Sequence, residues 1–403
     1  MSFKIETFKF GIEHEVAFIR PDGKFADFAN TTFSEFDAIV SRLPQYEQDY
    51  PQLRVGDAGI KLKRWYIEGF ERFNQAGEVT GCPPKGIEIR TTVHGSINSA
   101  VSQLTESFKL LRTEARKSGF SPALTSFHPY RHEFLPTPPL NVYEQRRRQE
   151  SPEMLTAHIP MLTQGPDLNL SAAGLTPAQL IDIGRKLTYY SPFIIPFSYS
   201  SPFYQGSLWY PLKSNTTGHS ASNTLDGATG AGLSARTFYR TGARPAAMVF
   251  LEHETDLMDS VPSLTQIARI PAEIGRIEFK AFDSCGDFEL YASLLTLLKG
   301  LVLEQTLQGR ATVPDAKQHQ QSAQFGFMDE AIYAQTQVVL NAVSDVMSTD
   351  QERDRLAVLQ AKLKQRYSPA HQMIEAYQQG EAIVDILQQG YGHVIAKTLV
   401  SAN

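Results

Sequence analysis

Four short segments of the sequence alternate apolar and polar residues and place two polar side chains two positions apart. Successive side chains of a strand point to opposite faces, so residues i and i+2 share a face. Each segment therefore predicts a strand with an apolar face and a polar face, and together they predict a sheet covered on one side. The segments are FGIEHEVAF, GIEIRTTV, GPDLNLSA and RIEFKAFD, with the pairs Glu13 and Glu15, Glu88 and Arg90, Asp167 and Asn169, and Glu278 and Lys280.

Strand patterns dominate before residue 285, and helical patterns follow it. This order predicts an α+β fold in which a sheet carries the site and helices buttress it. We expect one domain over residues 1–403, with a helical C-terminal part from about residue 288 to 403. Strands are predicted over 3–20, 86–93, 161–172 and 274–283. Helices are predicted from residue 98 or 99 to near 119, and over 176–187, 290–307, 329–347 and 350–367.

Three stretches carry weaker patterns. Residues 25–84 give mixed signals apart from an amphipathic stretch at 63–73, residues 120–150 are predicted to be surface loops, and residues 191–211 a packed irregular segment. Residues 213–235 are rich in Ser, Gly and Asn and are long for a structureless loop. They are expected to form either a lid or a disordered linker.

The composition excludes several classes of protein. A net charge of -5 lacks the basic excess that nucleic-acid binding needs, so no nucleic-acid partner is expected. Cys82 and Cys285 are too few for a disulfide framework or a zinc site, which fits the cytoplasm. No apolar stretch has the length of a membrane span. We expect a cytoplasmic protein, with a homodimer as the commonest state for its size.

A cavity lined by strand carboxylates suits magnesium, which takes oxygen ligands and bridges them to substrate phosphates. Neighbouring cations, among them Lys280, Arg236, Arg240 and Arg244, would hold phosphate oxygens. The alternative is a solvated sheet face, which shows the same alternation on every strand. The sequence has no P-loop and no GxSxG or HExxH motif. The histidines are scattered, and His14 is expected to face away from its neighbouring glutamates.

The order of these motifs resembles the glutamate-cysteine ligase type 2 and carboxylate-amine ligase family, a branch of the glutamine synthetase fold. FGIEHEV at 10–16 is similar to the family's opening Glu-x-Glu strand, and IPAEIGRIEFKAFDS at 270–284 to its late Glu-x-Arg strand. Between them, in the family's order, stand GIEIRTTV, FHPY at 127–130, GPDLNLSA, SPFYQG at 201–206 and LSARTFYR at 233–240.

The resemblance implies a curved antiparallel sheet that forms a funnel of the glutamine synthetase catalytic type, with ATP and Mg²⁺ inside. It implies that ATP phosphorylates an acid, commonly glutamate, and that an amine such as cysteine displaces the phosphate. Metal ligands would be Glu13, Glu15, Glu88 and Glu278. Cofactor contacts would be Glu13, Asn169, Arg236 and Lys280, of which Arg236 and Lys280 would also be catalytic.

Two departures from the family pattern leave the substrate open. Asp167 and Asn169 stand where relatives often carry histidines, and Lys280 stands in place of an arginine, which loses the planar two-donor fork. The leading hypothesis is glutamate-cysteine ligase. The alternatives are a ligase of the same type with another acid or amine, a phosphotransferase on a related sheet, and a nucleotide-binding regulatory relative without turnover.

Overall fold

The computed structural model describes residues 7–50, 63–149, 157–210, 230–242, 268–269 and 276–392. Its centre is one sheet in which every pair of neighbouring strands is antiparallel, with the order β10, β11, β7, β1, β5, β2 and with β6 beside β1. The strands are β1 (Phe8–Ile19), β2 (Trp65–Gly69), β5 (Pro84–Arg90), β6 (Ser121–Ala123), β7 (Pro166–Ala172), β10 (Ala268–Arg269) and β11 (Ile277–Phe279). The predicted α+β class with an antiparallel sheet is confirmed.

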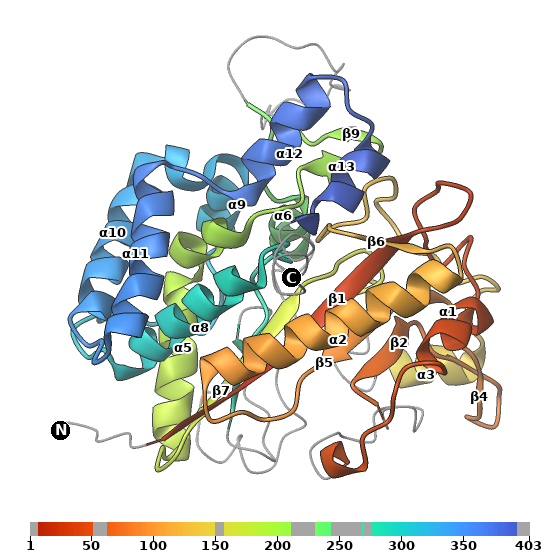
Figure 1. The fold of residues 1–403 in the computed structure, drawn as a ribbon, viewed down its shortest axis with the longest axis horizontal. Coiled ribbons are helices and arrows are strands. Elements are labelled where there is room, and N and C mark those ends of the chain that lie inside the picture. The colour runs from red at the N-terminus through yellow and green to blue at the C-terminus, as the bar shows by residue number, and fades with distance from the viewer. Residues whose placement is uncertain are drawn as a thin grey trace, which may run out of the picture.

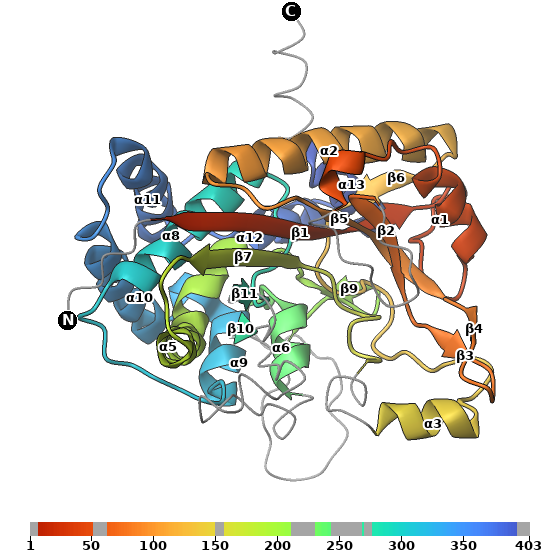
Figure 2. The same ribbon diagram turned by 90° about the horizontal axis from the view of Figure 1, so that it is seen from below.

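The strands have the predicted apolar face. Its buried side chains include Ile12, Val16, Ile87, Ile89, Leu168, Leu170 and Phe279. Figure 2 shows α2 (Ile97–Lys117) lying along this side of the sheet, with α6 (Ala235–Gly242) and α3 (Val142–Arg148) on the opposite side. Burial of these aliphatic and aromatic groups is the main stabilising contribution to the fold.

Helix α2 begins where its capping residue places it. The side chain of Ser96 accepts a hydrogen bond from the backbone N–H of Ser99 at 3.2 Å, which satisfies an otherwise unpaired donor. The predicted cap at residue 98 or 99 is therefore wrong by two to three positions. The sequence also predicts that Val101, Leu104, Phe108 and Leu111 share one face, and this is confirmed, because all four are buried.

Helices gather beside the sheet in the C-terminal part of the chain (Figure 1). Of the predicted helices, 290–307 corresponds to α8 (Phe288–Leu303), 329–347 to α10 (Glu330–Ser344) and 350–367 to α11 (Asp350–Lys364). Helix α8 is buried on nearly all sides, as its strongly apolar sequence predicts. Helices α9 (Ala316–Phe325), α12 (Pro369–Gln378) and α13 (Ile383–Gln389) were not predicted.

Helix α5 (Pro177–Ile194) extends into residues 191–211, which were predicted to be irregular. Its start matches the predicted one, with Thr176 as the cap and Pro177 in the first turn, but the helix continues past Leu187 with Pro192 inside it. Proline leaves the carbonyl of residue 188 without its usual N–H donor. The hydroxyl of Ser191 donates to that carbonyl at 2.8 Å instead. The short 3-10 helix η2 (Ile195–Ser198) follows directly, so the prediction of irregular structure over 191–211 was wrong for its first part.

The amphipathic stretch at 63–73, to which no element was assigned, forms β2 and β3 (Arg72–Phe73), and the latter pairs with β4 (Val79–Gly81). One further prediction was wrong. Residues 120–150, predicted to be loops, contain β6 and α3. Smaller elements are α1 (Phe33–Val40), η1 (Glu47–Asp49), β8 (Phe203–Tyr204) with β9 (Ser207–Leu208), and η3 (Gly326–Met328). The candidate lid at 213–235 lies mostly outside the described residues.

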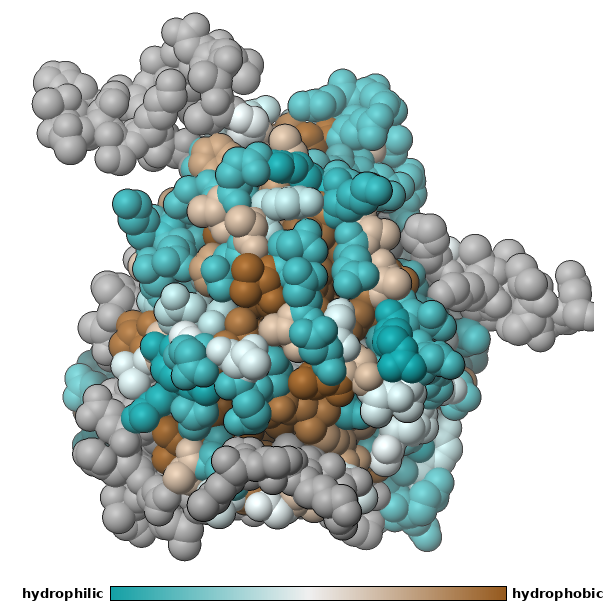
Figure 3. Space-filling model, turned by 90° about the vertical axis from the view of Figure 1, so that its left-hand side faces the viewer, coloured by the Kyte–Doolittle hydropathy of each residue, from teal (hydrophilic) through white to brown (hydrophobic). Residues whose placement is uncertain are grey.

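The face of the molecule at the left of Figure 1 is mostly hydrophilic, with apolar patches between polar groups (Figure 3). Exposed apolar residues of the helical part include Val338 on α10 and Val358 on α11. Single exposed residues of this kind are normal on a globular surface. Within the described part of the chain, no helix combines the length and the hydrophobicity that crossing a bilayer demands.

Candidate functional site

The register of the sheet brings the predicted polar pairs onto one face. Residues directly opposite each other on paired strands share a face. Glu13 of β1 stands opposite Arg90 of β5 on one side and Asp167 of β7 on the other. Glu15 stands opposite Glu88. Adjacent pairings place Glu278 of β11 opposite Asn169 of β7, and Tyr66 of β2 opposite Glu88. We call this surface the acidic face.

One group of carboxylates lies where β1, β7 and β11 adjoin. One oxygen each from Glu13, Asp167 and Glu278 lies within 4.8 Å of the others, and we call this group the first triad. Glu13 and Glu278 are buried, and Asp167 is partly exposed. The ammonium of Lys280 forms an ion pair with Asp167 and lies 3.2 Å from Glu278 Oε1. The first triad is therefore a pocket of negative charge with one lysine at its side.

A second group lies further along β1, towards β5 and β2. One oxygen each from Glu15, Glu68 and Glu88 falls within 4.8 Å of the others, which defines the second triad. Lys85 Nζ lies 2.6 Å from Glu15 Oε1 and 3.8 Å from Glu68 Oε2. The backbone N–H of Gly165 donates to the other oxygen of Glu15 at 2.9 Å. A lysine thus accompanies each triad.

Arg90 joins the two triads. Its Nη2 lies 3.3 Å from Glu13 Oε2 and 3.6 Å from Glu88 Oε1, so one guanidinium contacts a carboxylate of each triad. It also lies over the ring of Tyr66 and donates to the Tyr66 hydroxyl at 3.3 Å. Arg90 is held in place by these contacts and partly offsets the charge of the acidic face.

The carboxylates differ in how readily they ionise. Burial, together with the charges of Glu13 and Glu68, raises the pKa of Glu88 well above its ordinary value. Burial also raises the pKa of Asp167 to about 7, with Glu278 and Glu13 adding to the effect and Lys280 opposing it. Burial disfavours the charge of Glu13 as well, but Arg90, Lys280 and Arg276 outweigh it and lower the pKa of Glu13. Four lysine and arginine charges, those of Lys85, Arg90, Arg276 and Lys280, therefore do not compensate six clustered carboxylates.

The residues of the acidic face fit magnesium. All six triad ligands are hard carboxylate oxygens, which Mg²⁺ prefers. Within the described residues, the buried Oε1 of Glu88 and Oδ1 of Asn169 accept no hydrogen bond. A buried acceptor without a donor costs free energy unless another group satisfies it. Two oxygens bound to one Mg²⁺ at about 2.1 Å stand at most about 4.2 Å apart, so each triad needs only small side-chain movements.

Behind the acidic face, His14 is enclosed by aromatic rings. Its ring nitrogens lie 2.9 Å from the hydroxyl of Tyr391 and 3.0 Å from that of Tyr291. Phe108 and Phe288 contact its ring edge to face. Burial lowers the pKa of His14 to about 3, which keeps the imidazole neutral. The prediction that His14 points away from Glu13 and Glu15 and has a structural role is confirmed.

Arg236 does not belong to the acidic face. Its guanidinium donates to the backbone carbonyls of Lys280, Ala281 and Phe282 at 2.7 to 3.0 Å. It lies 3.6 Å from the buried carboxylate of Asp283, which also accepts hydrogen bonds from Ser200 and Ser201. The predicted phosphate contact by Arg236 is therefore not what its surroundings favour. Its contacts instead fix the chain after β11, from which Lys280 projects.

The structure brings together most of the predicted site and adds to it. Glu13, Glu15, Glu88, Glu278, Asn169 and Lys280 lie on one face. Sequence reasoning missed Glu68 and Lys85, and it placed Asp167 on the polar face without naming it as a metal ligand. Glu68 was detectable, because Trp65 and Ile67 alternate with Tyr66 and Glu68 as apolar and polar residues do in the other strands. Arg244 lies outside the described residues.

No protein-family model and no curated protein matches the sequence. Solved structures nonetheless share the fold. A glutamate–cysteine ligase from Francisella tularensis, in complex with AMP, superposes with a TM-score of 0.53 at 12% identity, over 98% of this chain and 90% of that one. A bifunctional glutathione synthetase from Pasteurella multocida gives 0.54 at 10% identity, over 98% of this chain and 53% of that one. The chain thus spans about half the length of the Pasteurella protein. At such identities the likeness establishes a shared fold.

Proposed function

We propose that this protein is an ATP-dependent carboxylate-amine ligase whose acidic face binds Mg²⁺ and the phosphates of ATP. The observation that carries the proposal is the pair of carboxylate triads on one face of an antiparallel sheet, each with a lysine beside it. A solvated sheet face offers no reason to bury Glu88 and Glu278 next to other carboxylates. Metal binding gives that reason, and the shared fold with two ligases supports the reaction class.

In this proposal the sheet corresponds to the funnel of the glutamine synthetase catalytic type. The first triad would hold one Mg²⁺ and the second triad another. Bound metal would polarise phosphoryl oxygens and neutralise the charge that develops on them. Asn169 Oδ1, which has no hydrogen-bond donor among the described residues, would contact the metal or nucleotide beside Glu278.

The reaction consists of two substitutions. A carboxylate oxygen of the acid attacks the γ-phosphorus of ATP and ADP leaves, which forms an acyl phosphate. The nitrogen of the amine then attacks the acyl carbon, loses a proton and expels inorganic phosphate, which leaves an amide. Lys280 offsets negative charge during phosphoryl transfer as a point charge, and Arg90 holds the two triads in position. Arg236 acts as a positioning residue for Lys280.

Glutamate as the acid and cysteine as the amine are the first substrates to test. The sequence resemblance favours them, and the Francisella structure is that of a glutamate–cysteine ligase. A ligase with another acid or amine, a phosphotransferase and a regulatory relative without turnover are the other outcomes. They differ in product, so one assay separates them.

The assay measures phosphate release from Mg-ATP with glutamate alone and then with a panel of amines that includes cysteine, with products identified by mass. The proposal predicts ADP, phosphate and an amide that form only with both acid and amine. A stable phosphorylated acid without amide would support the phosphotransferase. Nucleotide binding without turnover for every acid and amine pair would support the regulatory relative.

The metal assignment is tested by Glu13→Gln, which keeps the shape of the side chain and removes its charge. We expect loss of activity with the fold retained, as measured by circular dichroism. Glu106→Gln is the matched control, because Glu106 is an exposed glutamate of α2 on the covered side of the sheet. Near-normal turnover in Glu13→Gln would contradict the assignment.

A further inference from the structure

A cavity lies on the covered side of the sheet, away from the acidic face. Its volume is about 1100 Å³, which is large enough for a small metabolite or peptide. The N-terminal part of α8, helices α11, α12 and α13, and residues that flank them form its walls. Nothing in the proposed reaction uses this cavity.

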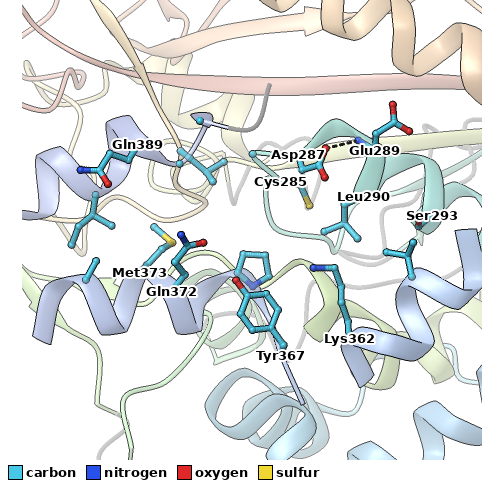
Figure 4. Close-up of a pocket in the computed structure, with 18 of the residues that line it drawn as sticks. Cys285, Asp287, Glu289, Leu290, Ser293, Lys362, Tyr367, Gln372, Met373 and Gln389 are labelled. Carbon is cyan, nitrogen blue, oxygen red and sulfur yellow. Dashed lines mark hydrogen bonds between the residues drawn. The ribbon is translucent and has the colours of Figure 1, made fainter. Parts of the chain in front are cut away.

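One wall of the cavity offers groups that bind an anion. Figure 4 shows Lys362, Tyr367 and Gln372 on this wall, facing Cys285, Asp287 and Leu290 on the other. The Nζ of Lys362 lies 5.0 Å from the centre of the Tyr367 ring. No carboxylate of the described residues forms an ion pair with Lys362. An ammonium, a phenol hydroxyl and an amide N–H are together suited to a carboxylate.

The remaining lining carries carboxylates and amides. Asp287, whose carboxylate also accepts a hydrogen bond from the backbone N–H of Glu289 at the start of α8, stands on the wall opposite Lys362. The amides of Gln379 and Gln389 line the cavity as well. Glu289, Asp354, Glu375 and Glu381 add four further acidic groups, and Arg355 adds a second cation. A ligand that complements the charges of both walls carries a carboxylate at one end and an ammonium at the other, with polar groups between them for the amides.

We propose that this cavity is a binding site for a zwitterionic amino acid or short peptide, whose carboxylate pairs with Lys362 and whose ammonium faces Asp287. The site is distinct from the acidic face, because the sheet separates them.

Hydrogen bonds connect the cavity to the strand that carries both triads. The backbone N–H of Cys285, which lines the cavity, donates to the hydroxyl of Tyr291 at 2.8 Å. Tyr291 contacts one ring nitrogen of His14, and Tyr391 contacts the other. Tyr391 stands between two cavity-lining glycines, Gly390 and Gly392. A ligand that shifts either wall therefore acts on His14, which lies between Glu13 and Glu15.

The connection makes the cavity a regulatory site for metal binding on the acidic face, and this regulatory role rests on the proposed function. Binding of an amino acid in the cavity is independent of that function. Calorimetric titration of the full chain, without ATP or metal, with a panel of free amino acids and dipeptides measures this binding. Lys362→Met removes the cation, and Lys364→Met is the matched control on the same helix, since Lys364 is exposed and does not line the cavity.

We expect saturable binding by at least one member of the panel, weakened about tenfold or more in Lys362→Met and unchanged in Lys364→Met. No binding by any member at millimolar concentration would overturn the proposal. Equal binding by Lys362→Met would also overturn it. Binding that is lost in Glu278→Gln but kept in Lys362→Met would place the amino acid on the acidic face and would likewise overturn the proposal.

The connection to β1 is tested by the affinity for Mn²⁺, with and without the panel member that binds. We expect the ligand to change Mn²⁺ affinity in the wild type and to leave it unchanged in Tyr391→Phe, which removes one hydrogen bond to His14. An equal ligand effect in both proteins would refute the route through Tyr391. If the protein binds no Mn²⁺ at all, the proposed function is wrong. The amino-acid site in the cavity is then judged by the calorimetric titration alone.

Discussion

Magnesium should stabilise this protein against heat, because six carboxylates are clustered in the metal-free fold. Each triad holds three carboxylate oxygens within 4.8 Å, where their charges repel one another. A ligand that binds the folded state at 100 times its dissociation constant stabilises it by about 2.7 kcal/mol. Metal bound at either triad relieves the repulsion, and the unfolded chain brings no such group of ligands together.

The size of the effect follows from the length of the chain. A protein of 403 residues unfolds with an entropy of about 0.85 kcal/mol per kelvin at its midpoint. One occupied triad therefore raises Tm by about 3 °C, and two raise it by about 6 °C. Differential scanning calorimetry measures this shift, with NaCl matched in ionic strength as the reference for screening.

Variants assign the shift to the two triads. Glu278→Gln removes a ligand from the first triad and Glu68→Gln from the second. Each should reduce the Mg²⁺ shift by about half, while Glu106→Gln keeps it whole. The reasoning is refuted if Mg²⁺ raises Tm no more than NaCl does, or if both triad variants show the full shift.

Three further changes test other parts of the account. Lys280→Met should lower kcat by about 100-fold through loss of one charge-stabilising group, and Lys280→Arg should restore most of it; equal rates in all three proteins would exclude a role in phosphoryl transfer. His14 stays neutral in the folded state until its pKa of about 3, while its ordinary value is 6.5, so acid favours the unfolded chain. Stability should be fully present above pH 6.5 and should fall below it by about 1.4 kcal/mol per pH unit, more steeply than in His14→Gln in urea unfolding. Gly300→Ala places a methyl 2.2 Å from Val343 and should cost about 1 to 3 kcal/mol in the same assay, without changing the Mg²⁺ shift; an unchanged midpoint would contradict the close packing of α8 on α10.

The sequence predicted the acidic face well because strand alternation is a local property. The faces of Glu13, Glu88 and Glu278 follow from a period of two along each strand, and the register then aligns them. Which strands are neighbours does not follow from the alternation. Only the sheet order places Asp167 beside Glu13 and so makes it a member of the first triad.

Other parts of the structure depend on contacts between distant residues. Lys85 was not predicted as a site residue, since its partner Glu15 lies 70 residues away. Arg236 was predicted to contact phosphate, but its guanidinium donates hydrogen bonds to the backbone carbonyls of residues 280–282. Pro192 is a residue that usually ends a helix, because it leaves the carbonyl of Thr188 without a backbone donor. The hydroxyl of Ser191 donates to that carbonyl instead, so the helix continues. Charge and residue type alone do not distinguish a positioning arginine from a substrate contact.

The central claim is that the acidic face couples ATP to activation of a carboxylate, and oxygen transfer tests it most directly. An acid that supports amide formation is labelled with ¹⁸O in its carboxylate, and the released phosphate is examined by mass. The account predicts that each amide formed transfers one ¹⁸O atom from the acid to inorganic phosphate, and that Glu13→Gln forms neither product. Amide formation with unlabelled phosphate, or with the label in AMP, would contradict it.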